Sequence, residues 1–451
     1  MPIHLDLQRT PRSLLPKLHR LFALSADKIL ALDKAWNPAR GAPVFTRNGK
    51  YASRGWTEWT QGFQAGSPLL QFDATAEARF LELGRSQTLR RMAPHLTHFG
   101  AHDHGFNIIS TYGNLWRLMR EGKIPFNQHE LNFYELALKI SGAVQAARWT
   151  RTADGAGFIY SFNGPHSLFV DSIRSLRSLA LAHCLGHFLL AEHDQRVSLL
   201  DRLASHALLI TRYNIYYGQG RDIYDVPGRV AHESLFNTID GSYRCPGAQQ
   251  GFSPFSTWTR GLAWALLGCA ELLEFLAARK PRAVAGLKAA LVRAGRVTAD
   301  FYIAGSFADG LPPWDTAAPN LDRLDLSKPA DPFNAWEPVD SSAAAIAAQG
   351  LFRLAHYLDP SGKTPDAARY RSAALTAANT LFDEPYLSTS PRHQGLVLHS
   401  VYHRPNGWDT IARGQKIPNG ESSMWGDYHA RELGLLLLRE ANSEKYLAFF
   451  A

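Results

Sequence analysis

The sequence predicts an all-α protein whose helices form a barrel of two concentric rings. Hydrophobic periodicity with the spacing of an α-helix recurs along most of the 451 residues. Alternating strand-like patterns are scarce and short, and Gly395–Tyr402 is an example. Helices that are apolar nearly all round alternate with helices that carry a polar face, and this alternation indicates an inner and an outer ring.

The helices are expected in pairs that recur about every 45–60 residues. In the segment Phe133–Ala147 one face is marked by the apolar positions Phe133, Leu136, Ala137, Ile140, Val144 and Ala147. The expected helices, in chain order, are Leu18–Leu32, Glu77–Met92, Phe133–Ala147, Ser172–Leu190, Leu262–Ala278, Val284–Thr298, Ser341–Leu358, Ala367–Leu381 and Asp427–Arg439. Loops rich in Gly, Pro and aromatic residues separate them.

Two kinds of helix alternate along the chain. Leu262–Ala278 is apolar nearly all round, as expected of a helix buried on all sides. Ala367–Leu381 has a polar face, made by Arg369, Arg371, Thr376 and Asn379. Since no low-complexity linker divides the chain, we expect a single catalytic domain over residues 1–451. A superhelical repeat array is the alternative, but such arrays usually keep a repeat consensus, and none is visible.

The composition is that of an ordinary globular protein with a large core, at 45% hydrophobic and 20% charged residues. Lys and Arg number 48 against 40 Asp and Glu, and the positive residues are scattered. A net charge of +8 spread in this way argues against nucleic-acid binding and suits an anionic substrate without requiring one. The 11 Trp and 16 Tyr are many for this length and favour contact with carbohydrate.

The cysteines and the N-terminus bear on the compartment. Cys184, Cys245 and Cys269 form no CxxC and are odd in number, so free thiols are expected rather than disulfides or a zinc site. Met1–Leu7 lacks the basic and apolar regions of a signal peptide, and no apolar run is expected to approach the ~20 residues of a membrane span. The default expectation is therefore a cytoplasmic protein without a membrane partner, or a periplasmic one if a signal was removed. The oligomeric state is not indicated.

The segment Gln250–Trp264 begins as a Gly/Pro/Ser loop and continues as an apolar helix. Arg260 and Trp264 are four residues apart and share one helix face. An arginine fork beside a flat aromatic surface suits an acidic sugar. A Trp-rich helix start is also often only core, with the arginine capping a carbonyl, so both interpretations stay open at this point.

His102-Asp103-His104-Gly105-Phe106 passes from a loop into a helix. Two histidines separated by one residue can bind metal, but the further ligands that such a site needs are missing from the sequence, so no metal is predicted. Asp103 is either the N-cap of the following helix or one carboxylate of a catalytic pair.

Asp171 follows the apolar run Leu168–Val170 and opens a helix. Capping is the commoner role for such a residue. At the mouth of an inner helix, however, its carboxyl would point into the cavity of the barrel, where burial and a second carboxylate raise a pKa enough for general acid catalysis. Asp340 repeats the pattern in Asp340-Ser341-Ser342, and for Asp340 we favour capping.

Several short motifs follow one another along the chain: Trp59-Thr60-Gln61-Gly62-Phe63, His102-Asp103-His104-Gly105-Phe106, Asp171 before its helix, Gln250 to Trp264, Pro313-Trp314-Asp315, Asp340-Ser341-Ser342-Ala343-Ala344-Ala345-Ile346-Ala347-Ala348, and Glu421-Ser422-Ser423-Met424-Trp425-Gly426-Asp427-Tyr428. In these motifs, from about Trp56 to Arg439, the chain resembles the unsaturated glucuronyl hydrolases, glycoside hydrolase family 88. It also resembles the related unsaturated rhamnogalacturonyl hydrolases of family 105. Each motif is modest alone, but their shared order is a specific signal.

The resemblance implies an (α/α)6 barrel, in agreement with the two rings predicted from the helix patterns. It implies as partner an oligosaccharide whose non-reducing end is a 4,5-unsaturated uronic acid left by a polysaccharide lyase. The implied reaction is hydration of the vinyl ether double bond: a general acid protonates C4, a water activated by a carboxylate adds at C5, and the resulting hemiketal opens. Neither a metal nor an organic cofactor is implied.

By position, the resemblance assigns the general acid/base to Asp171 and the second essential acid to Asp103. An ionised Asp103 is expected to keep Asp171 protonated near neutral pH. The residues expected to bind the sugar are Trp59, His102, His232, Gln250, Trp258, Arg260 and Trp264. Among them, Arg260 is expected to offset the substrate carboxylate and the tryptophans to pack on the ring.

The chain departs from the family pattern near the expected site. Gln249 stands where the family usually has a histidine, and Pro254 and Phe255 stand where acids are common. Arg174 and Arg177 follow Asp171, and one or the other is expected to salt-bridge a carboxylate and to lower the pKa of Asp171, which would weaken Asp171 as an acid. These departures bear on the identity of the sugar rather than on the scaffold.

Two other functions remain open from the sequence. The same barrel suits an enzyme that acts on a different glycoside or epimerises a sugar, and it suits a carbohydrate-binding protein without catalysis. The presence of both Asp103 and Asp171 favours an enzyme, a glycoside hydrolase.

Overall fold

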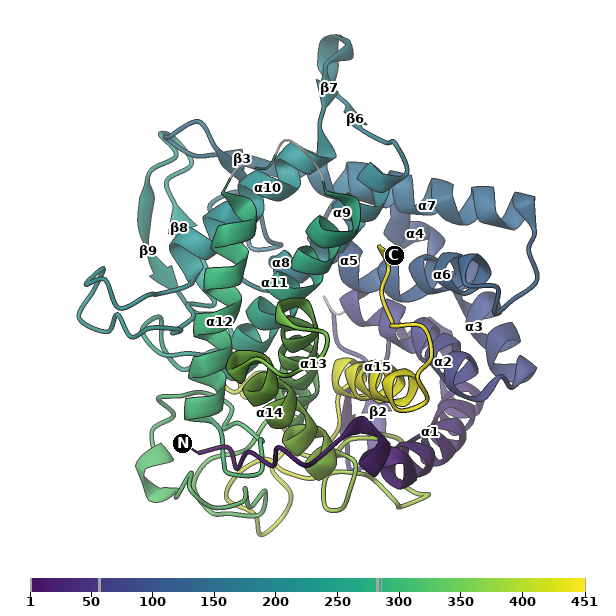
Figure 1. Ribbon diagram of the computed structural model, residues 1–451, viewed down its shortest axis with the longest axis vertical. Helices are drawn as coiled ribbons and strands as arrows, with labels where there is room; N and C mark the ends of the chain where they lie inside the picture. Colours follow the sequence, from purple (N-terminus) through teal and green to yellow (C-terminus); the bar gives the residue numbers. More distant parts are fainter. Residues whose placement is uncertain (1, 56–57, 281–283, 285, 451) are drawn as a thin grey trace.

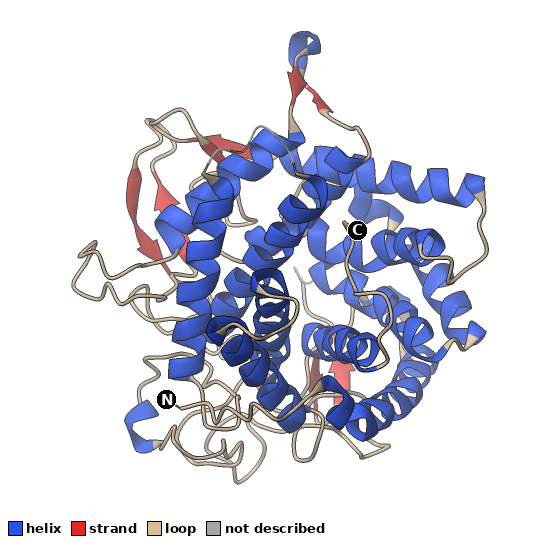
Figure 2. Ribbon diagram, in the orientation of Figure 1, coloured by secondary structure: helices blue, strands red, loops and turns tan. Residues whose placement is uncertain are grey.

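A computed structural model describes residues 2–55, 58–280, 284 and 286–450. Helices dominate this part of the chain, and strands are confined to small sheets at the left, at the top and in the lower centre of the view (Figure 2). The architecture is an (α/α)6 barrel, as predicted. Trp56, at which the family resemblance begins, lies outside the described residues. That residues 1–451 form a single domain stays a prediction.

The inner ring consists of six segments that contact one another in a closed circle (Figure 1). They are α2 (Gln61–Thr75); α5 (His104–Asn107), which continues through the π-helical η4 (Ile109–Gly113) into α6 (Asn114–Arg120); α8 (Ser172–Ser175) with α9 (Arg177–Cys184); α11 (Thr259–Arg279); α13 (Ser341–Leu358); and α15 (Met424–Ala441). α15 returns to α2, which closes the circle between the C-terminal and N-terminal parts of the chain.

The outer ring covers these segments, and each outer helix packs on an inner neighbour. Its helices are α1 (Leu15–Ala35), α3 (Ala78–Arg91), α7 (Gln128–Ala147), α10 (Leu199–Leu209), α12 (Leu287–Gly305) and α14 (Pro365–Leu381). The short helices are η1 (Pro11–Leu14), η2 (Pro38–Arg40), η3 (Glu58–Thr60), α4 (Ala93–Leu96), η5 (Glu192–Asp194), η6 (Ile210–Asn214, π-helical) and η7 (Leu321–Arg323).

The strands form small antiparallel sheets. They are β1 (Phe45–Arg47) with β2 (Lys50–Ala52), β3 (Trp149–Arg151) with β4 (Gly157–Ile159), β6 (Leu189–Leu190) with β7 (Arg196–Val197), and a three-stranded sheet of β5 (Ser167–Phe169), β8 (Glu233–Phe236) and β9 (Tyr243–Gly247). The segment Gly395–Tyr402, predicted as a short strand, makes only isolated bridges through Val397 and Leu398, so that prediction was wrong.

Most of the expected helices are present, and Ser341–Leu358 has the predicted bounds. The helix expected over Ser172–Leu190 is broken at Leu176 and ends at Cys184, ahead of Gly186, whose φ of 73° suits a helix terminus. α2 was missed because its Gly and Pro residues resemble loop composition. In the structure Gly62 and Gly66 let α2 approach the α5–η4 segment closely. A Cβ added at Gly62 would lie 2.4 Å from Asn107 Cα, and one added at Gly66 would lie 2.3 Å from the Ser110 carbonyl oxygen.

The expectation that no apolar run approaches the length of a membrane span was wrong for α11. This helix has 21 residues and a mean hydropathy of 1.6, and by length and composition alone it is long and apolar enough to cross a membrane. However, 83% of that apolar window is buried inside the protein, as is typical of a barrel's core helix. The cysteines are free thiols, as predicted.

A network of buried charges occupies the centre of the barrel. Arg174 on α8 pairs with Glu271 on α11 at 3.2 Å and with Glu432 on α15 at 2.7 Å. Arg177 on α9 reaches the same two carboxylates at 3.2 and 3.9 Å, so the expected carboxylate partner of Arg174 and Arg177 is not Asp171. All four side chains are at most 3% exposed, and their charges balance.

A third arginine extends this network to the C-terminal segment. Arg353 on α13 pairs with Glu274 on α11 at 3.0 Å and donates to the carbonyl of Leu447 at 2.8 Å. Tyr446 donates to the same Glu274 carboxylate at 2.7 Å. The residues after α15 are thereby fixed against the inner helices.

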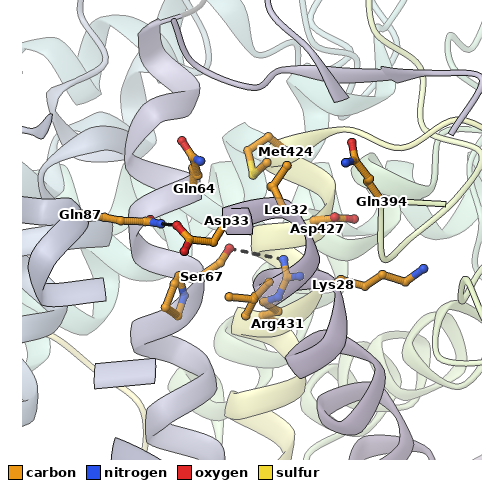
Figure 3. Close-up of a pocket in the computed structure, with 12 residues that line it drawn as sticks. Lys28, Leu32, Asp33, Gln64, Ser67, Gln87, Gln394, Met424, Asp427 and Arg431 are labelled. Atoms are coloured by element: carbon orange, nitrogen blue, oxygen red, sulfur yellow. Dashed lines mark hydrogen bonds between the residues drawn. The ribbon is translucent and has the colours of Figure 1, made fainter. Parts of the chain in front are cut away.

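A small cavity lies between α1, α2 and α15 (Figure 3). Arg431 crosses it, donating from Nε to Ser25 at 2.8 Å and from Nη1 to Ser67 at 3.3 Å. Gln87 donates to Asp33 at 2.7 Å beside it. The cavity measures about 20 Å³, room for about one water molecule, so it is a packing feature rather than a ligand site.

Breaking the central network should destabilise the whole barrel. Glu271→Gln leaves Arg174 and Arg177 short of a countercharge where water cannot reach, so we expect the free energy of unfolding to fall by about 3–5 kcal/mol. The measurement is urea unfolding followed by circular dichroism. Glu77→Gln, the matched change in the exposed Arg79–Glu77 pair, should cost less than about 1 kcal/mol. Equal losses in the two variants would contradict the central role of the network.

Candidate active site

A cavity of about 450 Å³ opens at one end of the barrel. It is lined by residues from the N-terminal ends of inner helices and from neighbouring loops and short elements: Gly55, Trp59, His98, Gly100, Ala101, His102, Asp103, Phe106, Phe162, Asn163, Phe169, Asp171, Gln249, Gln250, Trp258, Arg260, Trp264, Tyr402, His403, Asn406 and Trp408. All the predicted site residues except His232 are in this lining, and His232 lies directly behind it.

The three-stranded sheet brings Asp171 and His232 together. Phe169 on β5 is paired with Glu233 on β8, and the amide of Val170 donates to the carbonyl of His232 at 2.9 Å. Each functional residue is thus adjacent to a paired strand end, and His232 Nε2 lies 3.9 Å from Asp171 Oδ2. Asp171 makes no capping hydrogen bond to α8, although it occupies the N-cap position. The capping alternative for Asp171 is therefore wrong.

Asp103 reaches the same place through a close helix contact. Gly105 in α5 donates its amide to Ser175 Oγ at 2.8 Å, and an added Cβ at Gly105 would lie 2.3 Å from the Ser175 carbonyl oxygen. Only glycine permits this approach. It places the loop before α5 beside α8, and Asp103, which also makes no capping hydrogen bond, lines the cavity with Asp171.

His102 and His104 point to different places. His102 Nε2 lies 3.1 Å from Asp171 Oδ1, whereas the His104 ring is bonded to Ser141 Oγ at 2.8 Å and to the His98 carbonyl at 3.0 Å. A pair that diverges in this way does not chelate an ion. Among the described residues no group of three or more His, Cys, Asp or Glu side chains is arranged to hold a metal.

The electrostatics of the carboxyl pair are the reverse of the prediction. Burial raises the pKa of Asp103, and the neighbouring Asp171 charge adds to the effect. Burial also acts on Asp171, but the hydrogen bond and positive charge of His102 outweigh it and lower the pKa of Asp171. Asp103, not Asp171, is therefore the member of the pair that is more easily protonated in the free protein. The sequence could not show this because it depends on which carboxyl His102 contacts.

His232 is held in one tautomer. Its Nδ1 accepts from the backbone amides of Gln249 and Gln250 at 3.2 and 3.3 Å, and burial lowers its pKa to about 4. The ring is therefore neutral near pH 7 and carries its proton on Nε2, the nitrogen that faces Asp171. Gln249, which departs from the family pattern, contributes through its backbone.

Arg260 uses both of its terminal nitrogens for contacts within the protein. It pairs with Asp340 at 3.1 Å and donates to Gln250 Oε1 at 2.7 Å, to the Tyr402 carbonyl at 2.8 Å and to the Val401 carbonyl. It is 1% exposed. Asp340 already balances the charge of Arg260, and the terminal nitrogens of Arg260 are occupied. The structure therefore does not support the expectation that Arg260 offsets a substrate carboxylate. Asp340 also caps α13, as predicted, by accepting from the amides of Ser342 and Ala343.

Arg260 instead orients two parts of the cavity wall. Its bond to Gln250 Oε1 leaves the Nε2 amide of Gln250 without a protein acceptor among the described residues, on the cavity side. Its bonds to Tyr402 and Val401 anchor the loop that follows.

The tryptophans form the apolar part of the cavity. Trp264 packs against Phe106 with ring centroids 5.0 Å apart, and Trp59 stacks on Trp425 at 5.1 Å. Trp258 contacts the His232 ring at 4.6 Å and carries the Arg260 guanidinium over its face at 4.6 Å. Trp258, Trp264 and Trp59 are all in the cavity lining, so both interpretations of the Gln250–Trp264 segment apply: these residues are core and cavity wall at once.

Sequence inspection missed the wall made by Tyr402, His403, Asn406 and Trp408. Asp409 fixes this turn by accepting from the amides of Tyr402 and His403 at 2.5 and 3.0 Å. Arg54 stacks on Trp408 at 4.2 Å. The sequence contains no local signal for this wall, because it is held at the cavity by residues far away in the chain, among them Arg260 and Arg54.

No protein-family model matches the chain. The unsaturated glucuronyl hydrolase of Bacillus sp. (strain GL1) is 26% identical over 397 residues, which cover 86% of this chain and 89% of the relative. A solved unsaturated glucuronyl hydrolase specific for heparin superposes with a TM-score of 0.72 at 18% identity and covers 95% of this chain and 98% of that one. A further structure, with dGlcA-Glc-Rha-Glc, has a TM-score of 0.69 at 22% identity, with coverages of 94% and 96%.

Removing the countercharge of Arg260 should loosen this end of the barrel. In Asp340→Asn the amide oxygen can still cap α13, but the buried guanidinium loses its charge partner, so we expect unfolding to become easier by about 3–5 kcal/mol. Thermal unfolding monitored by tryptophan fluorescence measures this.

The matched control for this variant is Asp240→Asn. Asp240 makes the same local bonds to the amide and hydroxyl of Ser242, but without an arginine and in an exposed turn. Its transition temperature should change much less. If the two variants behave alike, Arg260 does not depend on Asp340.

Proposed function

The chain belongs to the unsaturated glucuronyl hydrolase family, glycoside hydrolase family 88, and we propose that it is a hydrolase of lyase-generated oligosaccharides. It releases the 4,5-unsaturated uronic acid from their non-reducing end. The observation that carries the proposal is the pair of carboxyl groups, Asp103 and Asp171, that line one aromatic cavity and have pKa values shifted in opposite directions. Such a split is typical of residues that share acid and base roles.

The cavity suits a flattened acidic sugar. Trp59, Trp258 and Trp264 offer apolar faces on which a ring can pack. The Gln250 side-chain amide offers a donor to its oxygens, whereas the Nε2–H of His232 is buried behind the cavity lining and faces Asp171. Because Arg260 is already paired with Asp340, the substrate carboxylate meets the side-chain amide of Gln250 rather than a free guanidinium.

The proposed reaction needs one proton and one water. Asp171 gives its proton to C4 of the vinyl ether while the double bond's electrons form the new C–H bond, and positive charge develops at C5 beside the ring oxygen. Water adds at C5, and its proton passes to the Asp171 carboxylate. The hemiketal then opens, and the bond to the next sugar breaks.

Asp171 is ionised at the start of this cycle, and binding of the substrate favours its protonated form. A carboxylate brought beside Asp171 favours its protonated form, because like charges at short range disfavour ionisation. Asp103, whose pKa is raised, adds to this effect whenever it is ionised. Asp171 thus acts as an acid only when the substrate is bound.

Asp171→Asn should lower kcat by about 10²–10⁴-fold, because an amide neither gives nor takes a proton. The assay is the loss of ultraviolet absorbance of the conjugated double bond in a panel of unsaturated disaccharides. Circular dichroism of the variant checks that the fold is intact. Full activity of the variant, or no turnover by the wild-type enzyme on a broad panel, would overturn the proposal.

A sugar epimerase is the second candidate for a barrel with two acids in its cavity. Product analysis by NMR after reaction in heavy water separates the two. Hydration places deuterium at C4, and epimerisation places it at the inverted carbon. A protein that binds the disaccharides without any turnover would instead be a carbohydrate-binding barrel.

A further inference from the structure

His102 lies between the two carboxyl groups of the cavity. Its Nε2 is 3.1 Å from Asp171 Oδ1 and 3.9 Å from Asp103 Oδ1. The side chain is 3% exposed. One ring nitrogen therefore faces both members of the carboxyl pair and is closer to Asp171.

The position of the ring is fixed from several sides. Phe162 lies parallel to it with an interplanar angle of 13°, and Phe169 meets it edge-on at 5.7 Å. The His102 carbonyl accepts from Gln145 Nε2 at 3.0 Å and from Ser175 Oγ at 2.6 Å. Nε2 is thereby aimed at Asp171 before any ligand binds.

The charges around His102 favour its imidazolium form. Asp103 and Asp171 face it, and the positive charge of Arg148 opposes their effect, while His206 is a further titratable neighbour. Arg148 is engaged with the carbonyls of Tyr160 and Ser161, and burial lowers the pKa of His206 to about 3, so His206 is neutral. Although burial disfavours the imidazolium, the two carboxylates raise the pKa of His102 above its ordinary value.

We propose that His102 is a positioning residue that stores the proton Asp171 delivers to the substrate, rather than a residue that binds the sugar. In the free enzyme the proton is on Nε2 and Asp171 is ionised. When the substrate carboxylate arrives, the Nε2–H bond breaks, an O–H bond forms on Asp171, and the electron pair stays on Nε2. After hydration the proton taken from water returns along the same hydrogen bond, so the enzyme ends in its starting state.

This role predicts how activity depends on pH. The active form holds one proton on the His102–Asp171 pair, and that proton is lost only as the pH rises through the raised pKa of His102. In His102→Gln the proton has only the Asp171 carboxyl to occupy, and a carboxyl releases it at lower pH than an imidazolium does. The alkaline limb of the kcat/KM profile should therefore move down by at least about one pH unit.

The kinetic test rests on the proposed function and separates storage from sugar binding. If His102 stores the proton, the alkaline limb of the kcat/KM profile of His102→Gln lies at lower pH and its kcat at pH 8 is reduced, with KM changed less than about threefold. A role in sugar binding predicts a raised KM with the limb unmoved, and that result would overturn the proposal. His19→Gln, the same change on the exposed face of α1, should leave both quantities unchanged.

A second measurement does not need turnover. In protein labelled with ¹⁵N-histidine, the resonances of His102 are those missing from the His102→Gln spectrum. We expect His102 to be protonated at pH 7 and its pKa to fall by at least about one unit in Asp171→Asn. A neutral His102 at pH 7, or an unchanged titration in Asp171→Asn, would refute storage even if the hydrolase activity is confirmed. If His102 titrates as expected but the enzyme turns over no disaccharide, only the proposed function is refuted.

Discussion

Charge balance at the centre of the barrel is the constraint on which the rest of the structure depends. Arg174 and Arg177 are carried by the α8–α9 segment and Arg353 by α13, and their partners Glu271, Glu274 and Glu432 are carried by α11 and α15. The Glu274 side chain is 11% exposed, and the other five side chains are at most 3% exposed, where water cannot replace a missing partner. A helix that turned or slid would leave one of them unpaired, so the network fixes how the inner helices face one another. The loops at the cavity end are positioned by these inner helices.

Arg260 applies the same principle at the cavity itself. Its charge is balanced by Asp340, and its remaining donors hold Gln250 and the Tyr402–Trp408 wall. A residue that the sequence suggests as a ligand for an acid is thus part of the frame that shapes the cavity. The positive charge nearest the reacting groups is that of His102, an ionisable group that can exchange its proton, which a guanidinium cannot do.

Local pattern predicted the helices whose sequence shows their burial. α13 and α11 have apolar periodicity over their whole length, and both were found close to their true bounds. α2 was missed because Gly62, Gly66 and Pro68, which read as loop residues, are there to admit a neighbouring backbone. The break after Ser175 was also missed: Gly105 of α5 approaches the Ser175 backbone there, and the local sequence does not show that contact. Helix patterns report the environment of single residues, whereas these features depend on what lies opposite.

The sequence by itself determined the helical class, the two kinds of helix and, through motifs in a family order, which residues meet in the cavity. The first two follow from side-chain chemistry and spacing along one chain, and the third follows from the resemblance to a known family. Only the tertiary structure decided which of Asp103 and Asp171 is more easily protonated and that Arg260 holds the cavity wall. Asp103 and Asp171 have the same side chain, and they differ because His102 is 3.1 Å from one and 3.9 Å from the other. Electrostatic energies depend on distance and burial between residues far apart in the chain, and the order of amino acids does not specify these.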